Sequence, residues 1–508
     1  MDLSQWIERH AAFTPDRPAI RFEERVIDWR SLAARVTGLA RGLAGRLSIG
    51  RGDRLAYLGY NHPDFLALLF ACARLGAMLV PLNWRLAPAE HLYILRHAGV
   101  RALFIGPGFE EAGERLVAEL GDVEPIASLP TAGKTCFEEL LASPGPDRHP
   151  HVDLESPLLV VYTSGTTGRP KGAVLRQQAL FWNAVNSAHM HDLTSADRVL
   201  TVLPMFHVGG LNIQTTPALH AGAEVILLDR FEAGRTLAAI RRFRPTLTVL
   251  VPATMRALVE HPDWTSTDLS SLRMIACGSQ VVPLPLLRAF HRRGVPAAQV
   301  YGSTETCPIA AYQRAADALR KEGSAGKPAL HCELRIVDRH GRDLPPGETG
   351  EVLVRGPNVM YEYWNDEAAT REALRDGWFH TGDVGRLDEE GDLWIVDRLK
   401  DVVISGGENI YPAELEAVLQ EEPAIRDAVV VGLPDPRWGE VPVAVVVRAD
   451  PSLDEARVLA LFEGRLARYK HPRAVVFMDE LPRNAMGKVL KYRVRDWLAV
   501  RAVRPQQG

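Results

Sequence analysis

The sequence lacks the features that mark secreted, membrane-spanning and nucleic-acid-binding proteins. No apolar run approaches the roughly 18 residues that a membrane span needs, and the first eight residues have neither the basic nor the apolar region of a secretory signal. A formal net charge of -4 gives no general attraction to nucleic acid or to anionic lipid. We therefore expect a cytoplasmic protein without an integral membrane segment or a nucleic acid partner, and any nucleotide is expected at a local site.

Cysteine is also scarce. The sequence has five cysteines, an odd number, and none of them belongs to a Cys-x-x-Cys pair. This pattern argues against a disulfide framework and against structural zinc. We expect reduced thiols at all five positions, which are Cys72, Cys136, Cys277, Cys307 and Cys332.

The length of the chain predicts more than one folding unit. Its 508 residues exceed the roughly 250–300 at which single hydrophobic cores stop growing. Apolar residues make up 46% of the chain and charged residues 24%, which is typical of an ordinary soluble protein with no shortage of core material.

Apolar runs of strand length alternate with helix-length stretches between residues 150 and 310, which predicts parallel β-structure with helical crossovers. These runs are Leu158–Tyr162, Val199–Pro204, Glu224–Leu228, Leu247–Pro252, Leu272–Ala276 and Gln299–Tyr301. Short strands with turns follow, and a compact α+β pattern begins at Lys400. We expect an α/β fold with a large multi-layer N-terminal domain over residues 1–399, which has parallel-rich sheets and a β-rich subdomain, and a small α+β domain over residues 400–508.

The segment Tyr162–Gly172 predicts a phosphate-binding loop directly behind an apolar strand. Its glycines let backbone N–H groups approach an anion, its hydroxyls add donors, and Lys171 adds a cation. The spacing does not fit the Gly-x-x-x-x-Gly-Lys-Ser/Thr pattern of a Walker A loop. The residues expected to contact phosphate are Thr163, Ser164, Gly165, Thr166, Thr167, Gly168 and Lys171.

Six segments in this order resemble the acyl-adenylate-forming superfamily, which comprises acyl-CoA synthetases, luciferases and peptide-synthetase adenylation domains. They are Tyr162–Gly172, Tyr301–Glu305, Thr381–Asp383, Asp397–Asp401, Gly406–Pro412 and Pro482–Lys488. The resemblance covers nearly the whole chain. It implies that the small C-terminal domain is mobile, that the site lies between the domains, and that ATP, Mg²⁺ and CoA are used.

The resemblance assigns roles that suit the chemistry of joining two anions. A carboxylate must attack the α-phosphate of ATP, so repulsion of about 4 kcal/mol for each pair of unit charges at about 4 Å has to be offset. Glu305 is expected to hold Mg²⁺ and Thr304 to contact the α-phosphate. Asp383 and Arg398 are expected at the ribose. Adenine is expected between Tyr301 and the turn Gly278, Ser279 and Gln280, and Gly302 is expected to contribute to nucleotide binding.

The resemblance also implies a moving C-terminal domain. Lys488 is expected to bridge the carboxylate and the α-phosphate during adenylation, a task that suits a mobile point charge. Lys400 is expected to be the hinge whose rotation withdraws Lys488. The rotation would bring a CoA-binding segment to a pantetheine tunnel, and that segment consists of Ser405, Gly406, Gly407 and Glu408.

The acid is predicted to be hydrophobic. His207 is expected to line the acyl site, and the neighbouring segment has no carboxylate of the kind that pairs with an amino-acid substrate. We interpreted Gly302, where acetate-type enzymes carry tryptophan, as leaving the tunnel open. The expected pocket residues are Trp182, Val208, Gly209, Val251, Val281 and Cys307. A medium- or long-chain fatty acid and an aryl or arylpropenoic acid fit these residues equally well.

The leading hypothesis is an AMP-forming acid–CoA ligase. Transfer of the acyl group to a carrier protein, a luciferase-like oxygenase, and a nucleotide-binding protein without catalysis are the alternatives. Lys171, Glu305, Asp383 and Lys488 are all present, which argues against the last of these. The choice of acid, and whether the protein is a homodimer, stay open at this point.

Overall fold

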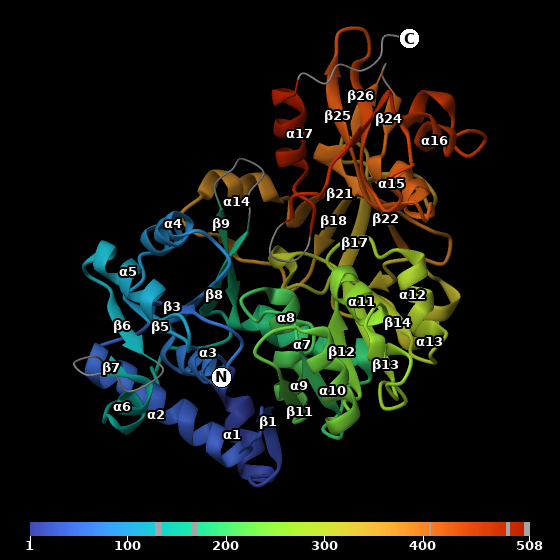
Figure 1. Ribbon diagram of the computed structural model, residues 1–508. Helices are drawn as coiled ribbons and strands as arrows, with labels where there is room; N and C mark the ends of the chain where they lie inside the picture. Colours follow the sequence, from blue (N-terminus) through green and yellow to red (C-terminus); the bar gives the residue numbers. More distant parts are fainter. Residues whose placement is uncertain (128–134, 164–169, 406–407, 484–487, 502–508) are drawn as a thin grey trace. The chain divides into compact units, whose positions relative to one another are not determined.

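The computed structural model describes residues 1–127, 135–163, 170–405, 408–483 and 488–501, and the bounds and sheet orders below refer to these residues. Packing divides the chain into two units (Figure 1). Unit 1 comprises Met1–Leu334 and Val354–Phe379, and unit 2 comprises Arg335–Leu353 and His380–Gly508. The division reflects packing and not motion, so the domain boundary and hinge expected at Lys400 stay predictions.

A nine-stranded sheet in unit 1 has the order β16-β15-β14-β13-β12-β10-β11-β1-β2. The neighbours from β14 to β1 are parallel, and the other pairs are antiparallel. Its strands are β1 (Pro18–Phe22), β2 (Arg25–Asp28), β10 (Arg198–Thr201), β11 (Glu224–Leu227), β12 (Leu247–Leu250), β13 (Met274–Gly278), β14 (Ala297–Tyr301), β15 (Ala311–Tyr312) and β16 (Lys327–Pro328). All residues of β12 and β13 are buried, as expected of parallel strands covered by helices on both faces. The predicted alternation of strands and crossovers is confirmed, and the blue β1 lies beside the green β11 in Figure 1.

A second sheet in unit 1 has the order β19-β9-β8-β4-β3-β5-β6-β7. Its strands are β3 (Arg54–Leu58), β4 (Met78–Leu82), β5 (Ala102–Ile105), β6 (Glu124–Ala127), β7 (Thr135–Cys136), β8 (Pro157–Thr163), β9 (Lys171–Arg176) and β19 (Glu362–Tyr363). Strands β8 and β9 form an antiparallel pair in which Thr163 lies opposite Lys171. The expected phosphate-binding loop therefore begins and ends at neighbouring positions of one sheet.

Helices connect the strands of unit 1. They are α1 (Ser4–Phe13), α2 (Trp29–Leu47), α3 (Pro63–Leu75), α4 (Pro88–Ala98), α5 (Glu110–Leu120), α6 (Phe137–Ala142), α7 (Gln177–His191), α8 (Val208–Asn212), α9 (Thr215–Ala221), α10 (Ala233–Phe243), α11 (Pro252–Val259), α12 (Leu284–His291), α13 (Ala315–Arg320) and α14 (Glu367–Ala373). Every residue of α3 is buried because this largely apolar helix is covered on all sides. Within the described ranges, no helix has the length and apolar content that crossing a membrane requires.

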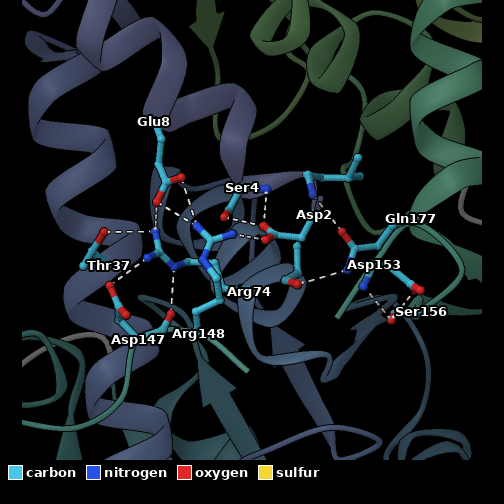
Figure 2. A network of polar contacts seen from close by, with 12 residues as sticks. Asp2, Ser4, Glu8, Thr37, Arg74, Asp147, Arg148, Asp153, Ser156 and Gln177 are labelled. Carbon is cyan, nitrogen blue, oxygen red and sulfur yellow. Dashed lines mark hydrogen bonds and ion pairs between the residues drawn. The ribbon is translucent and has the colours of Figure 1, made fainter. Parts of the chain in front are cut away.

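Polar side chains tie the N-terminus to helices from both sheets (Figure 2). The backbone N–H of Leu3 donates to Oε1 of Gln177 at 2.8 Å, at the start of α7. The guanidinium of Arg74, in α3, is nearly fully buried and donates to carboxylates of Glu8 at 2.6 Å and Asp147 at 2.8 Å. Helix α3 connects β3 with β4, and α7 leads from β9 to β10. The network therefore braces the two layers of unit 1 against each other.

Most residues of two smaller sheets belong to unit 2. In one, β21 (Trp378–Leu387) pairs with β18 (Gly350–Arg355) and β22 (Leu393–Arg398), and β17 (Glu333–Val337) pairs with β18. The other has the order β24-β23-β26-β25, with β27 on β26. Its strands are β23 (Val403–Ser405), β24 (Glu408–Ile410), β25 (Ile425–Asp435), β26 (Gly439–Arg448) and β27 (Ala474–Phe477). Alternate residues of β25 and β26 form two apolar clusters, one covered by α15 (Pro412–Gln420) and α16 (Glu455–Ala460), the other by α17 (Lys491–Val500).

Candidate active site

The carboxyl ends of the parallel strands in the nine-stranded sheet bring several expected site residues to one edge. Ligands in open α/β sheets bind at this edge. Strand β10 leads to His207, β12 to Val251, β13 to Gly278–Gln280 and β14 to Tyr301–Glu305. The fold thus gathers residues that are up to about a hundred positions apart in the sequence.

Glu305 lies in a rigid turn after β14. Its side chain and that of Thr304 are buried, and the backbone N–H of Met360 donates to the carbonyl oxygen of Glu305 at 2.7 Å. The amide nitrogen of Asn358 donates to two carbonyl oxygens of the same turn, those of Thr306 at 2.6 Å and Ile309 at 2.8 Å. These bonds fix the backbone that carries the expected metal ligand.

The structure gives a backbone reason for the glycine at position 302. Its φ is +153°, and a Cβ atom at this position would lie 1.6 Å from the carbonyl oxygen of Pro308. No side chain fits there unless the Glu305 turn moves. Glycine is therefore required by the close approach of two backbone segments. The interpretation that Gly302 also leaves the acyl tunnel open stays a prediction.

Lys171 and Glu305 both contact one residue that the sequence analysis missed. The ammonium of Lys171 lies 5.4 Å from the centroid of the Tyr363 ring, and the hydroxyl of Tyr363 donates to Oε1 of Glu305 at 2.8 Å. The signal in the sequence was the aromatic segment Tyr361–Trp364, which matches none of the six motifs. Of the expected phosphate loop, residues 164–169 lie outside the described residues, including Ser164, Gly165, Thr166, Thr167 and Gly168.

The expected acyl-site residues His207, Val208 and Gly209 lie at the start of α8. Nδ1 of His207 accepts a hydrogen bond from the backbone N–H of Gly209 at 3.1 Å, and burial lowers the pKa of His207 to about 4. The ring is therefore neutral at pH 7 and carries its proton on Nε2. The amide nitrogen of Asn212 contacts Sγ of Cys307 at 3.5 Å, which connects α8 to the Glu305 turn. Val208 is fully buried in the same helix.

Other expected pocket residues are more widely spread. The Trp182 ring packs against His331 with centroids 4.6 Å apart, and Val251 is buried at the start of α11. Val281 is 60% exposed, so the structure places it on the surface of unit 1. Their contact with an acyl group stays a prediction.

In unit 2, Asp383 and Arg398 face each other on paired strands. Nε of Arg398 lies 2.8 Å from Oδ1 of Asp383, and Gly382 at φ +66° turns the chain just before the carboxylate. The hydroxyl oxygen of Thr381 accepts a hydrogen bond from the backbone N–H of Asp383 at 3.0 Å. A buried carboxylate held in this way can accept two hydroxyl hydrogen bonds, as the predicted ribose contact requires.

Lys488 lies near this pair in unit 2. The N–H of Leu490, two residues after Lys488, donates to the carbonyl oxygen of Pro482 at 2.8 Å. Burial and the nearby Arg398 lower the pKa of Lys488 to about 8, and Asp383 acts in the opposite direction. The structure therefore brings together three residues that the sequence placed in separate motifs.

The expected hinge and CoA segment also lie in unit 2. Lys400 lies in the turn Leu399–Asp401. Ser405 and Glu408 are opposite each other on β23 and β24. Gly406 and Gly407, between them, are outside the described residues.

The residues fit a magnesium ion that arrives with nucleotide. The described part of the chain has no group of three side chains that could hold a metal by itself. Mg²⁺ usually takes one or two carboxylates and completes its shell with phosphate and water. Glu305 could supply one carboxylate, because its Oε1 is bonded to Tyr363 and its Oε2 could bind a metal.

Comparisons with known proteins cover nearly the whole chain. The family model described as AMP-binding enzyme matches residues 7–364, and the model of the AMP-binding enzyme C-terminal domain matches residues 414–488. An indoleacetate–CoA ligase of Aromatoleum aromaticum is 55% identical over 98% of both chains. A feruloyl-CoA synthase of an Amycolatopsis species is 43% identical over 97% of this chain and 98% of its own. The structure of o-succinylbenzoate CoA synthetase from Bacillus subtilis with its acyl-adenylate intermediate is similar at a TM-score of 0.87, with 34% identity over 99% of both chains.

Proposed function

The chain belongs to the AMP-binding enzyme family, and we propose that it joins an aryl-substituted carboxylic acid to CoA at the expense of ATP. It is an AMP-forming acid–CoA ligase with ATP, Mg²⁺ and CoA as the other reactants. The observation that carries the aryl class is the 55% identity with an indoleacetate–CoA ligase over nearly the full length. Feruloyl-CoA synthase, the second relative, is likewise named for an acid with an aromatic ring.

Adenylation forms a bond between a carboxylate oxygen of the acid and the α-phosphorus of ATP, and pyrophosphate leaves. Lys171 and Lys488 would offset the charge that the acid and the phosphates bring together. Bound Mg²⁺, held by Glu305, supplies further neutralisation of the phosphates. Asp383 and Arg398 would orient the ribose, and the ion pair between them keeps both side chains in place before nucleotide binds.

In the second step the sulfur of CoA attacks the acyl carbon, and the bond between that carbon and the AMP oxygen breaks. We propose that the hinge at Lys400 withdraws Lys488 between the steps and presents the segment from Ser405 to Glu408 to CoA. Neutral His207 would direct its Nε2 proton toward the acyl site. A neutral donor avoids the free-energy cost of placing a charge in the apolar surroundings of α8.

Mass spectrometry of a panel of acids tests this function. The purified protein would be incubated with ATP, Mg²⁺, CoA and one of indoleacetic, ferulic, benzoic, octanoic or palmitic acid, with Lys488→Ala alongside. We expect aryl thioester and AMP from the unaltered protein, and much smaller amounts of both products from the variant. Thioester from the fatty acids alone would contradict the aryl class. Adenylate without thioester would indicate a carrier protein or oxygen as the acceptor and would contradict CoA ligation.

Two finer expectations are part of the same proposal. A cytoplasmic location is tested by cell fractionation, and a homodimer is tested by light scattering of the purified protein.

A further inference from the structure

Tyr363 contacts two residues of opposite charge in unit 1. One face of its ring receives the ammonium of Lys171, 5.4 Å from the ring centroid, which is within the range of cation–π attraction. Its hydroxyl donates to Oε1 of Glu305 at 2.8 Å, a hydrogen bond to a charged acceptor. A single side chain therefore contacts both the expected phosphate cation and the expected metal ligand.

The backbone holds Tyr363 from two directions. Tyr363 lies on β19, opposite Ala173 of β9, and the N–H of the next residue, Trp364, donates to the carbonyl oxygen of Gly172 at 2.7 Å. On the other side, the N–H of Met360 donates to the carbonyl oxygen of Glu305 at 2.7 Å. Strand β9 belongs to the eight-stranded sheet, and Glu305 follows β14 of the nine-stranded sheet. The short strand β19 thus connects the two sheets at the point where their functional side chains meet.

An ammonium and a carboxylate that both approach the same nucleotide attract each other when the nucleotide is absent. A direct ion pair would occupy the lysine needed for phosphate and the carboxylate needed for metal. Among the residues that the structure describes, Lys171 forms no ion pair with a carboxylate and Glu305 forms none with a cation. Each instead has an uncharged partner in Tyr363. Exchange of the Tyr363 ring for a phosphate as the partner of Lys171 costs little free energy, because a cation–π contact is weaker than a phosphate ion pair.

We propose that Tyr363 is a positioning residue that keeps Lys171 and Glu305 apart and ready for magnesium-bound nucleotide. The proposal rests on the proposed function, because it assigns phosphate to Lys171 and Mg²⁺ to Glu305. The hydroxyl binds Oε1 of Glu305, which would leave Oε2 for the metal, and the ring contacts the ammonium of Lys171.

Nucleotide binding measured by calorimetry, with no acid or CoA present, tests the proposal without turnover. The affinity for ATP would be measured with and without Mg²⁺ for the unaltered protein, Tyr363→Phe and Tyr363→Leu. Tyr361→Phe is the matched control, because Tyr361 lies two residues away, is 47% exposed and contacts Arg176 instead.

We expect the two variants at position 363 to differ. Tyr363→Phe keeps the ring, so affinity for ATP without Mg²⁺ should stay within about twofold, whereas the gain in affinity from Mg²⁺ should fall about tenfold because a charge-assisted hydrogen bond to its ligand is lost. Tyr363→Leu removes the ring as well, so Lys171 and Glu305 can pair directly and affinity should fall about tenfold even without Mg²⁺. Adding Glu305→Gln to Tyr363→Leu should restore that metal-free affinity, because the competing carboxylate is gone.

Two results would overturn the proposal. Equal losses of ATP affinity in Tyr363→Phe with and without Mg²⁺ would indicate that the tyrosine only supports the fold. The same conclusion would follow if adding Glu305→Gln to Tyr363→Leu did not restore the affinity for ATP. Thermal unfolding of each variant separates these effects from failure to fold. An unaltered protein that binds no ATP would instead contradict the proposed function itself.

Discussion

Lys488→Met should make unit 2 more stable while it abolishes adenylation. Burial and Arg398 lower the pKa of Lys488 from 10.5 to about 8, so the folded state holds this proton less tightly than the unfolded state does. At about 1.36 kcal/mol per unit, the charged lysine costs the folded state on the order of 3 kcal/mol. Methionine has a similar length and no charge, so the variant should recover part of this free energy.

The pH dependence has a definite sign. Below about pH 8 Lys488 is protonated in both states, and its cost to the folded state is present in full. Between about pH 8 and 10.5 the unfolded state binds more protons, so the stability of the unaltered protein rises with pH and the advantage of Lys488→Met shrinks.

Lys491→Met is the matched control, because it makes the same chemical change three residues later. Burial disfavours the charge of Lys491, but Glu416, 3.0 Å away, and Asp397 outweigh burial and raise its pKa. Removal of Lys491 leaves buried carboxylates without their cation and should destabilise unit 2. The contribution of Lys491 is present below the unfolded pKa and is lost as pH rises through the folded pKa.

Hydrogen exchange of slowly exchanging amides in α17 and β26 at pH 6.5 and pH 9 measures these effects, after correction for intrinsic rates. We expect slower exchange in Lys488→Met and faster exchange in Lys491→Met at pH 6.5, with the first effect smaller at pH 9. A loss of protection in both variants at pH 6.5 would refute the reasoning, because it would indicate that Lys488 stabilises the fold like any other packed side chain.

Three further predictions concern activity. The rate of ATP–pyrophosphate exchange should fall as pH rises above about 8, because Lys488 loses the charge that adenylation needs. A Lys488→Arg variant with residual activity should lack this decline, and an identical decline in that variant would show that another group causes it. Asp383→Asn should raise the KM for ATP about tenfold, because Arg398 loses its carboxylate partner and the ribose an acceptor, whereas an unchanged KM would exclude a ribose contact. Gly302→Ala should lower the rate of ATP–pyrophosphate exchange at least tenfold, because the alanine Cβ would lie 1.6 Å from the Pro308 carbonyl oxygen and displace the Glu305 turn. Full activity would show that the turn accommodates the side chain without loss of function.

Features that lie in short, local segments were the easiest to interpret from the sequence. Asp383 and Arg398 could be assigned to one contact because each lies in a motif of a few residues, and the antiparallel pairing of β21 and β22 then places them side by side. The alternating apolar runs between residues 150 and 310 predicted the parallel strands, because a buried parallel strand needs a continuous apolar run.

Other features depend on contacts between distant segments and could not be predicted. Tyr363 lies 58 residues from Glu305 and on a strand of two residues, too short for any period to mark it. The requirement for Gly302 comes from a carbonyl oxygen six positions later, after a turn whose path the sequence does not specify. The packing of Arg335–Leu353 with unit 2 likewise depends on sheet pairing and not on composition.

The central claim, that the carboxylate attacks the α-phosphorus of ATP, is tested most directly by isotope transfer. The protein would be incubated with indoleacetate labelled with ¹⁸O in its carboxylate, together with ATP, Mg²⁺ and CoA, and the products would be analysed by mass spectrometry. We predict one ¹⁸O atom in the phosphate of AMP, one ¹⁸O retained in the thioester and unlabelled pyrophosphate. Label in inorganic phosphate, with ADP as the nucleotide product, would contradict the account.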